Sequence, residues 1–141
     1  MTASPKLDLA SIRIMPARAR LVLSWEPGDS IMVTDALAKA AIERYPTIVA
    51  HSCINPHGPS FGHAIRKTSI PHLIEHIIIE EQVGAMLARG GGDAKSLERT
   101  LVGTTTLDES KGEAVVEVSF ADDLVCARAA VAAVEFANSH A

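Results

Sequence analysis

Residues 70–82, IPHLIEHIIIEEQ, predict a long apolar helix that also carries histidines and glutamates. Ser69 can cap the start of this helix, and Pro71 lies in its first turn, where a missing N–H is harmless. Three glycines at 90–92 favour an end near Arg89. A helix that is apolar nearly all round is buried on most sides, so we expect this one inside the protein.

Three polar residues of this helix, His72, Glu75 and His76, fall within about 100° of arc at the helical repeat. Because their neighbours are apolar, these side chains should stand in the wall of a pocket. Burying a charge without a partner is unfavourable by several kcal/mol. Two imidazoles four positions apart can both bind one divalent ion, which would supply that partner. The helix therefore predicts a metal site.

The spacing His-x-x-Glu-His is also the inverted form of a zinc-peptidase signature. In that scheme His72 and His76 bind Zn²⁺ through neutral imidazoles, and Glu75 is the catalytic general base. The metal would lower the pKa of a water molecule to about 7, so that Glu75 can take its proton at neutral pH. The alternative is that the histidines are structural, because a five-residue pattern also arises by chance in helices.

A third metal ligand must come from another part of the chain. Five of the six histidines fall within residues 51–76, together with Cys53. Glu80 lies about 6 Å beyond His76 along the helix axis, so we expect it to orient His76 rather than to bind the metal. The sequence does not choose among the other candidates, which are His51, Cys53, His57 and Glu135.

The rest of the chain predicts a single α+β domain, with a small sheet covered by about three helices. Residues 1–10 are expected to form a flexible tail, and residues 11–141 the domain. Residues 46–67 have no sustained period and predict a long irregular loop, of a kind that is often functional. Strands are predicted within 11–25, 101–107 and 113–120, and helices at 34–45, 70–89 and 121–141.

Composition excludes several functional classes. The 141 residues carry a formal net charge of −4, which argues against a nucleic-acid partner. No apolar run approaches the roughly 18 residues that cross a bilayer, so no membrane partner is expected. The two cysteines do not form a disulfide framework, which favours a reduced, cytoplasmic protein. The oligomeric state stays open, with a homodimer among the alternatives.

Roughly residues 40–138 resemble the N-terminal domain of cyanophycin synthetase. The most specific feature is the helix pattern H-x-x-E-H-x-x-x-E-x-Q, and the strand and Ala-rich helix over 116–138 are similar to the end of that domain. The matching positions are His51, Cys53, Phe61, Thr68, His72, Glu75, His76, Glu80 and Gln82. The chain departs from the family at Ala50, where a glutamate is usual, and at Thr106, where an arginine is usual.

The resemblance implies a domain that binds a cyanophycin-like chain, a polymer of aspartate with arginine side branches. Some members of the family are similar to metallopeptidases and cleave this polymer. We therefore expect a zinc-dependent hydrolase of a peptide or isopeptide amide, with a peptide or polyamide substrate. The alternative is a non-catalytic module for peptide binding or oligomerisation that keeps the fold without the chemistry. The two departures leave the substrate open.

Overall fold

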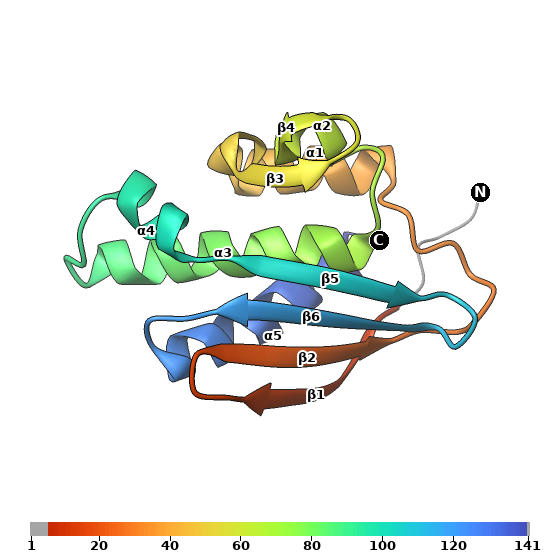
Figure 1. Ribbon diagram of the computed structural model, residues 1–141. Helices are drawn as coiled ribbons and strands as arrows, with labels where there is room; N and C mark the ends of the chain where they lie inside the picture. The colour runs from red at the N-terminus through yellow and green to blue at the C-terminus, as the bar shows by residue number, and fades with distance from the viewer. Residues whose placement is uncertain (1–5, 141) are drawn as a thin grey trace.

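The computed structural model describes residues 6–140 and contains a four-stranded sheet at one side of the molecule (Figure 1). All neighbouring strands are antiparallel. Their order across the sheet is β1 (Asp8–Ile14), β2 (Arg18–Ser24), β6 (Glu113–Ser119) and β5 (Gly103–Asp108). The strands β1 and β5 are thus the two edges. The predicted α+β class is confirmed.

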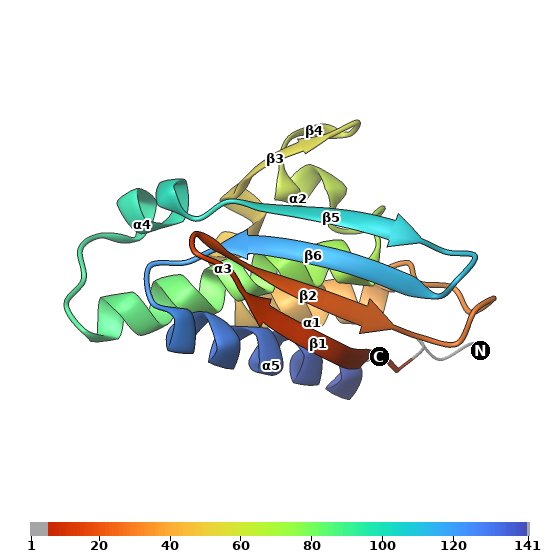
Figure 2. The ribbon, with the colours of Figure 1, turned by 60° about the horizontal axis from the view of Figure 1, so that its bottom comes forward.

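Period-two alternation determines which face of the sheet is buried. In β6 the side chains of Ala114, Val116 and Val118 are buried, and in β2 those of Leu21 and Leu23 are buried. Alternate residues of a strand point to the same face, so these side chains form one apolar surface. Two helices cover that surface, α3 (Ile70–Ala88) and α5 (Asp123–Ser139), as Figure 2 shows.

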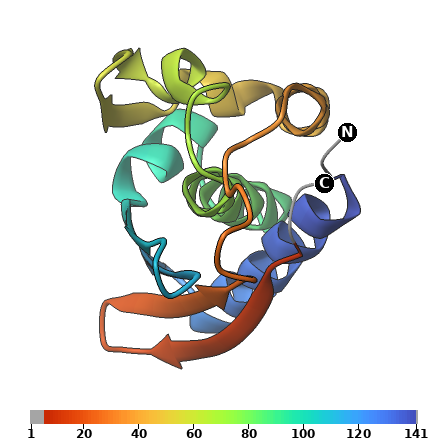
Figure 3. The same cartoon turned by 90° about the vertical axis from the view of Figure 1, so that its right-hand side faces the viewer.

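The helix α3 lies in the middle of the molecule. The sheet lies on one side of it, and a layer that includes α1 (Asp35–Arg44) lies on the other side (Figure 3). Most of its apolar side chains are buried, as the sequence predicted. Ser69 accepts a hydrogen bond from the N–H of His72, and Gly90 has a positive φ of 75° just after the last turn. Both predicted ends of the helix are therefore confirmed to within one residue.

The predicted irregular loop over 46–67 is wrong, because short elements fill most of it. Asn55 organises the hairpin: its Oδ1 accepts hydrogen bonds from the N–H groups of His57 and Gly58. Phe61 is fully buried and anchors the segment to the core. The elements are the 3₁₀ helix η1 (Pro46–Ala50), the strands β3 (Ser52–Asn55) and β4 (Gly58–Ser60), and the short helix α2 (Phe61–Ala64).

Two further expectations need correction. The flexible tail predicted over 1–10 does not extend to residue 10. The strand β1 begins at Asp8, and Leu7 is buried, with its N–H donating to Oδ1 of Asn138. Residues 1–5 of that tail lie outside the described part. The sequence also missed α4 (Ala94–Thr100). Among the described residues, no helix combines the length and apolar character that a bilayer span requires.

Candidate metal centre

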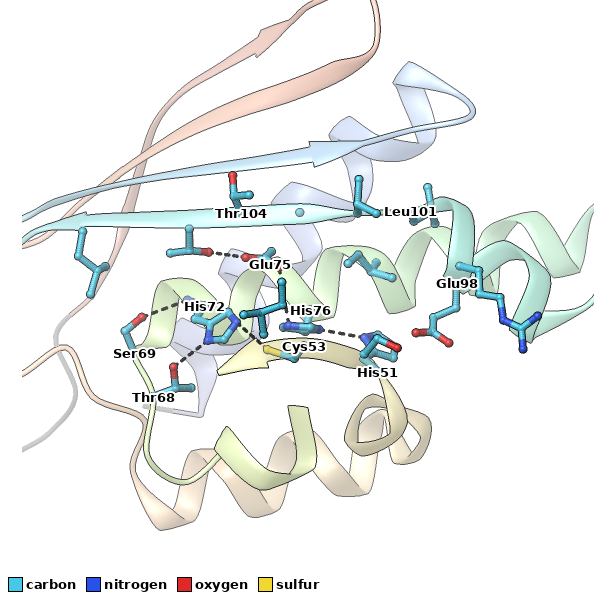
Figure 4. A pocket seen from close by; sticks show the side chains of 18 residues that line it. His51, Cys53, Thr68, Ser69, His72, Glu75, His76, Glu98, Leu101 and Thr104 are labelled. Atoms are coloured by element: carbon cyan, nitrogen blue, oxygen red, sulfur yellow. Dashed lines mark hydrogen bonds and ion pairs between the residues drawn. The ribbon is translucent and has the colours of Figure 1, made fainter. Parts of the chain in front are cut away.

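Three side chains that the sequence singled out meet at one point of the structure (Figure 4). One donor atom from each of Cys53, His72 and His76 lies within 4.8 Å of the other two. The histidines come from the first two turns of α3, and Cys53 comes from β3. These three residues, the Cys-His-His cluster, could hold a metal ion. Of the candidates for the third ligand, Cys53 is the one that lies within reach of both histidines.

The hydrogen bonds of His72 leave one ring nitrogen directed at Cys53. Its Nδ1 lies 2.8 Å from Oγ1 of Thr68, and its Nε2 lies 3.4 Å from Sγ of Cys53. Burial raises the pKa of Cys53, and the charge of Glu75 raises it further, although a hydrogen bond with Asn55 opposes them. The thiol can therefore donate to Nε2, while Nδ1–H donates to Thr68. Nε2 keeps the lone pair that a metal needs.

A chain of hydrogen bonds fixes the tautomer of His76 in a similar way. Nε2 of His51 lies 2.7 Å from Oε1 of Glu80, and because a carboxylate only accepts, His51 donates there. With that proton on Nε2, Nδ1 of His51 is the acceptor for Nδ1–H of His76, 3.1 Å away. This arrangement leaves Nε2 of His76 as the ring nitrogen with a free lone pair.

That free nitrogen is buried. The His76 side chain stacks on Phe61 with ring centroids 4.0 Å apart, and it is 3% exposed. Burial lowers the pKa of His76 to about 2, with smaller contributions from His72 and His51, so the ring is neutral. Its Nε2 has no hydrogen-bond partner within residues 6–140. Buried polar atoms are normally paired, so this nitrogen is a candidate donor atom for a ligand at the Cys-His-His cluster.

Glu80 is not hydrogen-bonded to His76 itself, so its predicted orienting role would have to act through His51. It accepts hydrogen bonds from His51 and from Oγ1 of Thr47, 2.6 Å away. Burial by itself would raise the pKa of Glu80, but the hydrogen bonds from His51 and Thr47 outweigh it and lower the pKa. The carboxylate therefore stays charged and acts on His76 through His51.

Glu75 lies beside the cluster. The residue is 5% exposed, its Oε1 accepts a hydrogen bond of 2.7 Å from Oγ1 of Thr105, and its Oε2 lies 3.7 Å from Nε2 of His76. Because His76 is neutral, this last contact is not an ion pair. Burial raises the pKa of Glu75, although Thr105 and His51 oppose the shift. Gly103 leaves space for the Glu75 side chain, because a Cβ at this position would come within 2.7 Å of Cγ of Glu75.

The cluster and Glu75 line a cavity of about 750 Å³. One wall is α3, a second is β3, and a third is formed by α4 and β5, which contribute Glu98, Arg99 and Thr105. The cavity is of a size that holds small ligands or a short chain segment. Cys53 and His72 are only partly buried at this cavity, whereas His76 lies deeper.

Two of the predicted ligand candidates lie elsewhere. His57 is exposed in the turn between β3 and β4, and Glu135 is exposed on α5. His51 is buried next to His76, but it is bonded to Glu80 and serves the cluster indirectly.

Two hydroxyl partners of the site received no role from the sequence: Thr68 was named only as a matching position of the resemblance, and Thr105 was not singled out. Thr68 precedes His72 by four residues, and this proximity is a signal that sequence reasoning could have used. Thr105 lies 30 residues from Glu75, on the edge strand of the sheet, and no local pattern connects the two. Its position follows from the strand order alone.

No family model matches the chain, and no curated protein sequence matches it either. The resemblance to the N-terminal domain of cyanophycin synthetase thus stays a prediction. The structure contributes the α+β fold and the Cys-His-His cluster.

Proposed function

We propose that the chain is a zinc-dependent hydrolase of a peptide or isopeptide amide, with Cys53, His72 and His76 as ligands and Glu75 as general base. The unpaired Nε2 of the buried His76, next to a thiol and a second imidazole at an accessible cavity, carries this proposal. It is a donor atom with no other evident use.

The donor set fits zinc better than the harder divalent cations. Thiolate and imidazole are the ligands that zinc prefers, whereas Mg²⁺ and Ca²⁺ take oxygen ligands. Three protein ligands are also the number found in catalytic zinc sites, where a fourth position is left for water or substrate. A bound zinc ion would supply a Lewis acid that polarises the amide carbonyl and makes water more acidic.

Glu75 has the environment of a general base. Its raised pKa brings it nearer to neutrality, where a carboxylate takes and returns protons more readily. The bond from Thr105 holds Oε1, so Oε2 is the oxygen left to take the proton of an attacking water. The same proton can then pass to the nitrogen of the leaving amine.

The cavity and the sequence resemblance together support an amide in a charged polymer. Glu98 and Arg99 give the cavity one carboxylate and one guanidinium. A polymer of aspartate that carries arginine has groups complementary to both. We propose such a chain, or a peptide with both charges, as the substrate.

The runner-up is a non-catalytic module for peptide binding or oligomerisation. The contact between Cys53 and His72 favours it, because a thiol donating to an imidazole satisfies both groups without a metal. This alternative leaves Nε2 of His76 unpaired. Under this alternative we expect no stoichiometric metal, and we expect that a chelator does not change the affinity for a peptide.

The proposed function is tested by comparing Glu75→Gln with Glu98→Gln in zinc-loaded protein. The substrate is a short polyaspartate peptide with arginine attached to its side chains, and product is followed by mass spectrometry. Glu75→Gln should keep zinc and lose at least about 100-fold in rate, since general bases contribute 10²–10⁴-fold. Glu98→Gln removes a carboxylate that the proposal assigns to substrate binding, so it should raise KM and keep most of kcat. Full activity in Glu75→Gln with zinc bound would contradict the assignment.

A further inference from the structure

The edge strand β5 has an unpaired side that faces the cavity. It pairs only with β6 in the described structure, and four of its residues line the cavity, namely Gly103, Thr104, Thr105 and Leu107. Figure 4 shows this strand running past Glu75. The polar backbone groups on its outer side are therefore next to the proposed reaction centre.

The hydrogen-bond pattern identifies which groups are free. The N–H of Ser119 donates to the carbonyl of Val102 over 2.9 Å, so Val102 and Ser119 form a hydrogen-bonded pair. Such pairs alternate along an antiparallel ladder. In the observed register, the N–H and C=O groups of Gly103, Thr105 and Leu107 point away from β6. Within residues 6–140, no hydrogen bond to these groups is present.

This edge lacks the devices that usually protect a free strand. Natural sheets blunt an edge with charged residues, proline or a bulge. The other edge, β1, has an irregularity between Leu9 and Ser11 and carries Arg13. In contrast, β5 has a regular register and no charged residue or proline before Asp108. An unprotected edge beside a cavity indicates a place where another strand binds.

We propose that the free edge of β5 binds an extended polypeptide segment as an added strand, which the cavity holds across the Cys-His-His cluster. This inference rests on the proposed function and specifies its substrate as an extended backbone rather than a compact small amide. A segment paired with Thr105 would pass directly beside Glu75, because Oγ1 of Thr105 is bonded to that carboxylate.

The surroundings favour a chain segment over a second copy of the domain. The same cavity is bounded by β3, which contributes Cys53 and Ile54, so the space in front of the edge is walled on its far side. Ile54 is fully exposed and Val102 is 64% exposed, so both can contact the side chains of a bound segment. Pairing of two β5 edges would bring a whole sheet against the β3–β4 hairpin.

The test is an NMR titration of the full chain, in the zinc-treated Glu75→Gln variant so that no peptide is cleaved. The probes are acetyl-(Val-Lys)₃-amide and the same peptide with N-methyl groups on alternate backbone nitrogens. Lysine suits the net negative charge of the protein, and valine favours an extended chain. The plain peptide should shift the amide signals of Gly103, Thr105 and Leu107. The methylated peptide should bind about threefold to tenfold more weakly for each bond lost.

A pair of protein variants separates backbone from side chain. Leu107→Pro removes an outward N–H without breaking the ladder to β6, and Leu107→Ala keeps it. The proline variant should bind the plain peptide about threefold to tenfold more weakly than the alanine variant. Equal affinity for both peptides, no shift at the three amides at millimolar peptide, or self-association through β5 would each overturn the inference. These readouts need no hydrolysis, so shifts at the edge without zinc or activity would reject the proposed function alone.

Discussion

At the scale of single residues, His51 and Glu80 act on the Cys-His-His cluster through His76. Groups that hold the outer nitrogen of a histidine ligand fix its tautomer and raise its basicity. Here the sequence of contacts runs from Thr47 to Glu80, His51 and His76, with each donor and acceptor role set by the charged carboxylate. This series of hydrogen bonds leaves Nε2 of His76 free.

Glu80→Gln should weaken zinc binding by about 10- to 100-fold, the range found when such supporting residues are removed. The amide of glutamine can donate to His51 as well as accept from it. His51 is then no longer forced to accept a hydrogen bond from His76. Glu81→Gln is the matched control, because Glu81 is the next residue of α3 and is bonded to Tyr45 instead. Zinc affinity is measured by competition with a chromogenic chelator. Equal affinity in the two variants would contradict the chain of hydrogen bonds.

Gly103→Ala should reduce hydrolysis while leaving zinc bound. The added methyl group would come within 2.7 Å of Cγ of Glu75, so the Glu75 side chain must leave its present position. The control Gly84→Ala meets no atom within 4 Å, lies exposed within α3, and should raise the stability by about 0.5–1 kcal/mol. Rate, zinc content and urea unfolding are measured together. Unchanged turnover in Gly103→Ala would show that the position of Glu75 is not critical.

At the scale of elements, the N-terminus of α3 sets the geometry of both histidines. Ser69 caps this end and is itself buried, with its Oγ accepting the N–H of His72 over 3.2 Å. His72 lies in the first turn, where an uncapped helix frays first. The cap therefore contributes to the cluster as well as to the fold.

Ser69→Ala should lower the stability by about 1 kcal/mol and also weaken zinc binding. Thr34→Ala removes the equivalent cap of α1, where Oγ1 of Thr34 accepts a hydrogen bond from the N–H of Leu37 over 3.1 Å. This control should show a similar loss of stability with no change in zinc affinity. Chemical unfolding and chelator competition supply the two readouts. A loss of zinc affinity in both variants would mean that general stability, not the cap of α3, controls the site.

The long elements could be predicted from the sequence because their periodicity and caps are local. The buried strands and α3 follow from the spacing of apolar residues and from Ser69. The short elements over 46–64 could not be predicted, since they depend on the turn at Asn55 and on the burial of Phe61. Likewise, the histidine pair of α3 was visible as an i, i+4 pattern, whereas Thr105 reaches Glu75 only through the strand order.

At the scale of the whole molecule, the two cysteines occupy different layers. Cys126 is fully buried in α5 against the core, and burial, with a smaller contribution from Asp123, raises its pKa to about 11. Cys53 is half-buried at the cavity. The fold therefore protects one thiol and presents the other to ligands.

Iodoacetamide at neutral pH should modify Cys53 in metal-free protein and leave Cys126 unmodified until the chain unfolds. Thiolates react, and both burial and a high pKa suppress the thiolate of Cys126. Added zinc should slow the reaction at Cys53, because a ligand sulfur is not free to attack. Peptide mass spectrometry gives the modified fraction at each site. Modification of Cys53 at the same rate with and without zinc would remove it from the ligand set.

Elemental analysis tests most directly whether α3 and β3 together form a zinc site. The protein is purified without a histidine tag, treated with zinc and desalted, and the His76→Ala variant is processed in parallel, with circular dichroism to verify its fold. We expect about one zinc per chain in the wild-type protein and none in a folded His76→Ala variant. No zinc in the wild-type protein after this treatment, or equal zinc in the variant, would contradict this expectation.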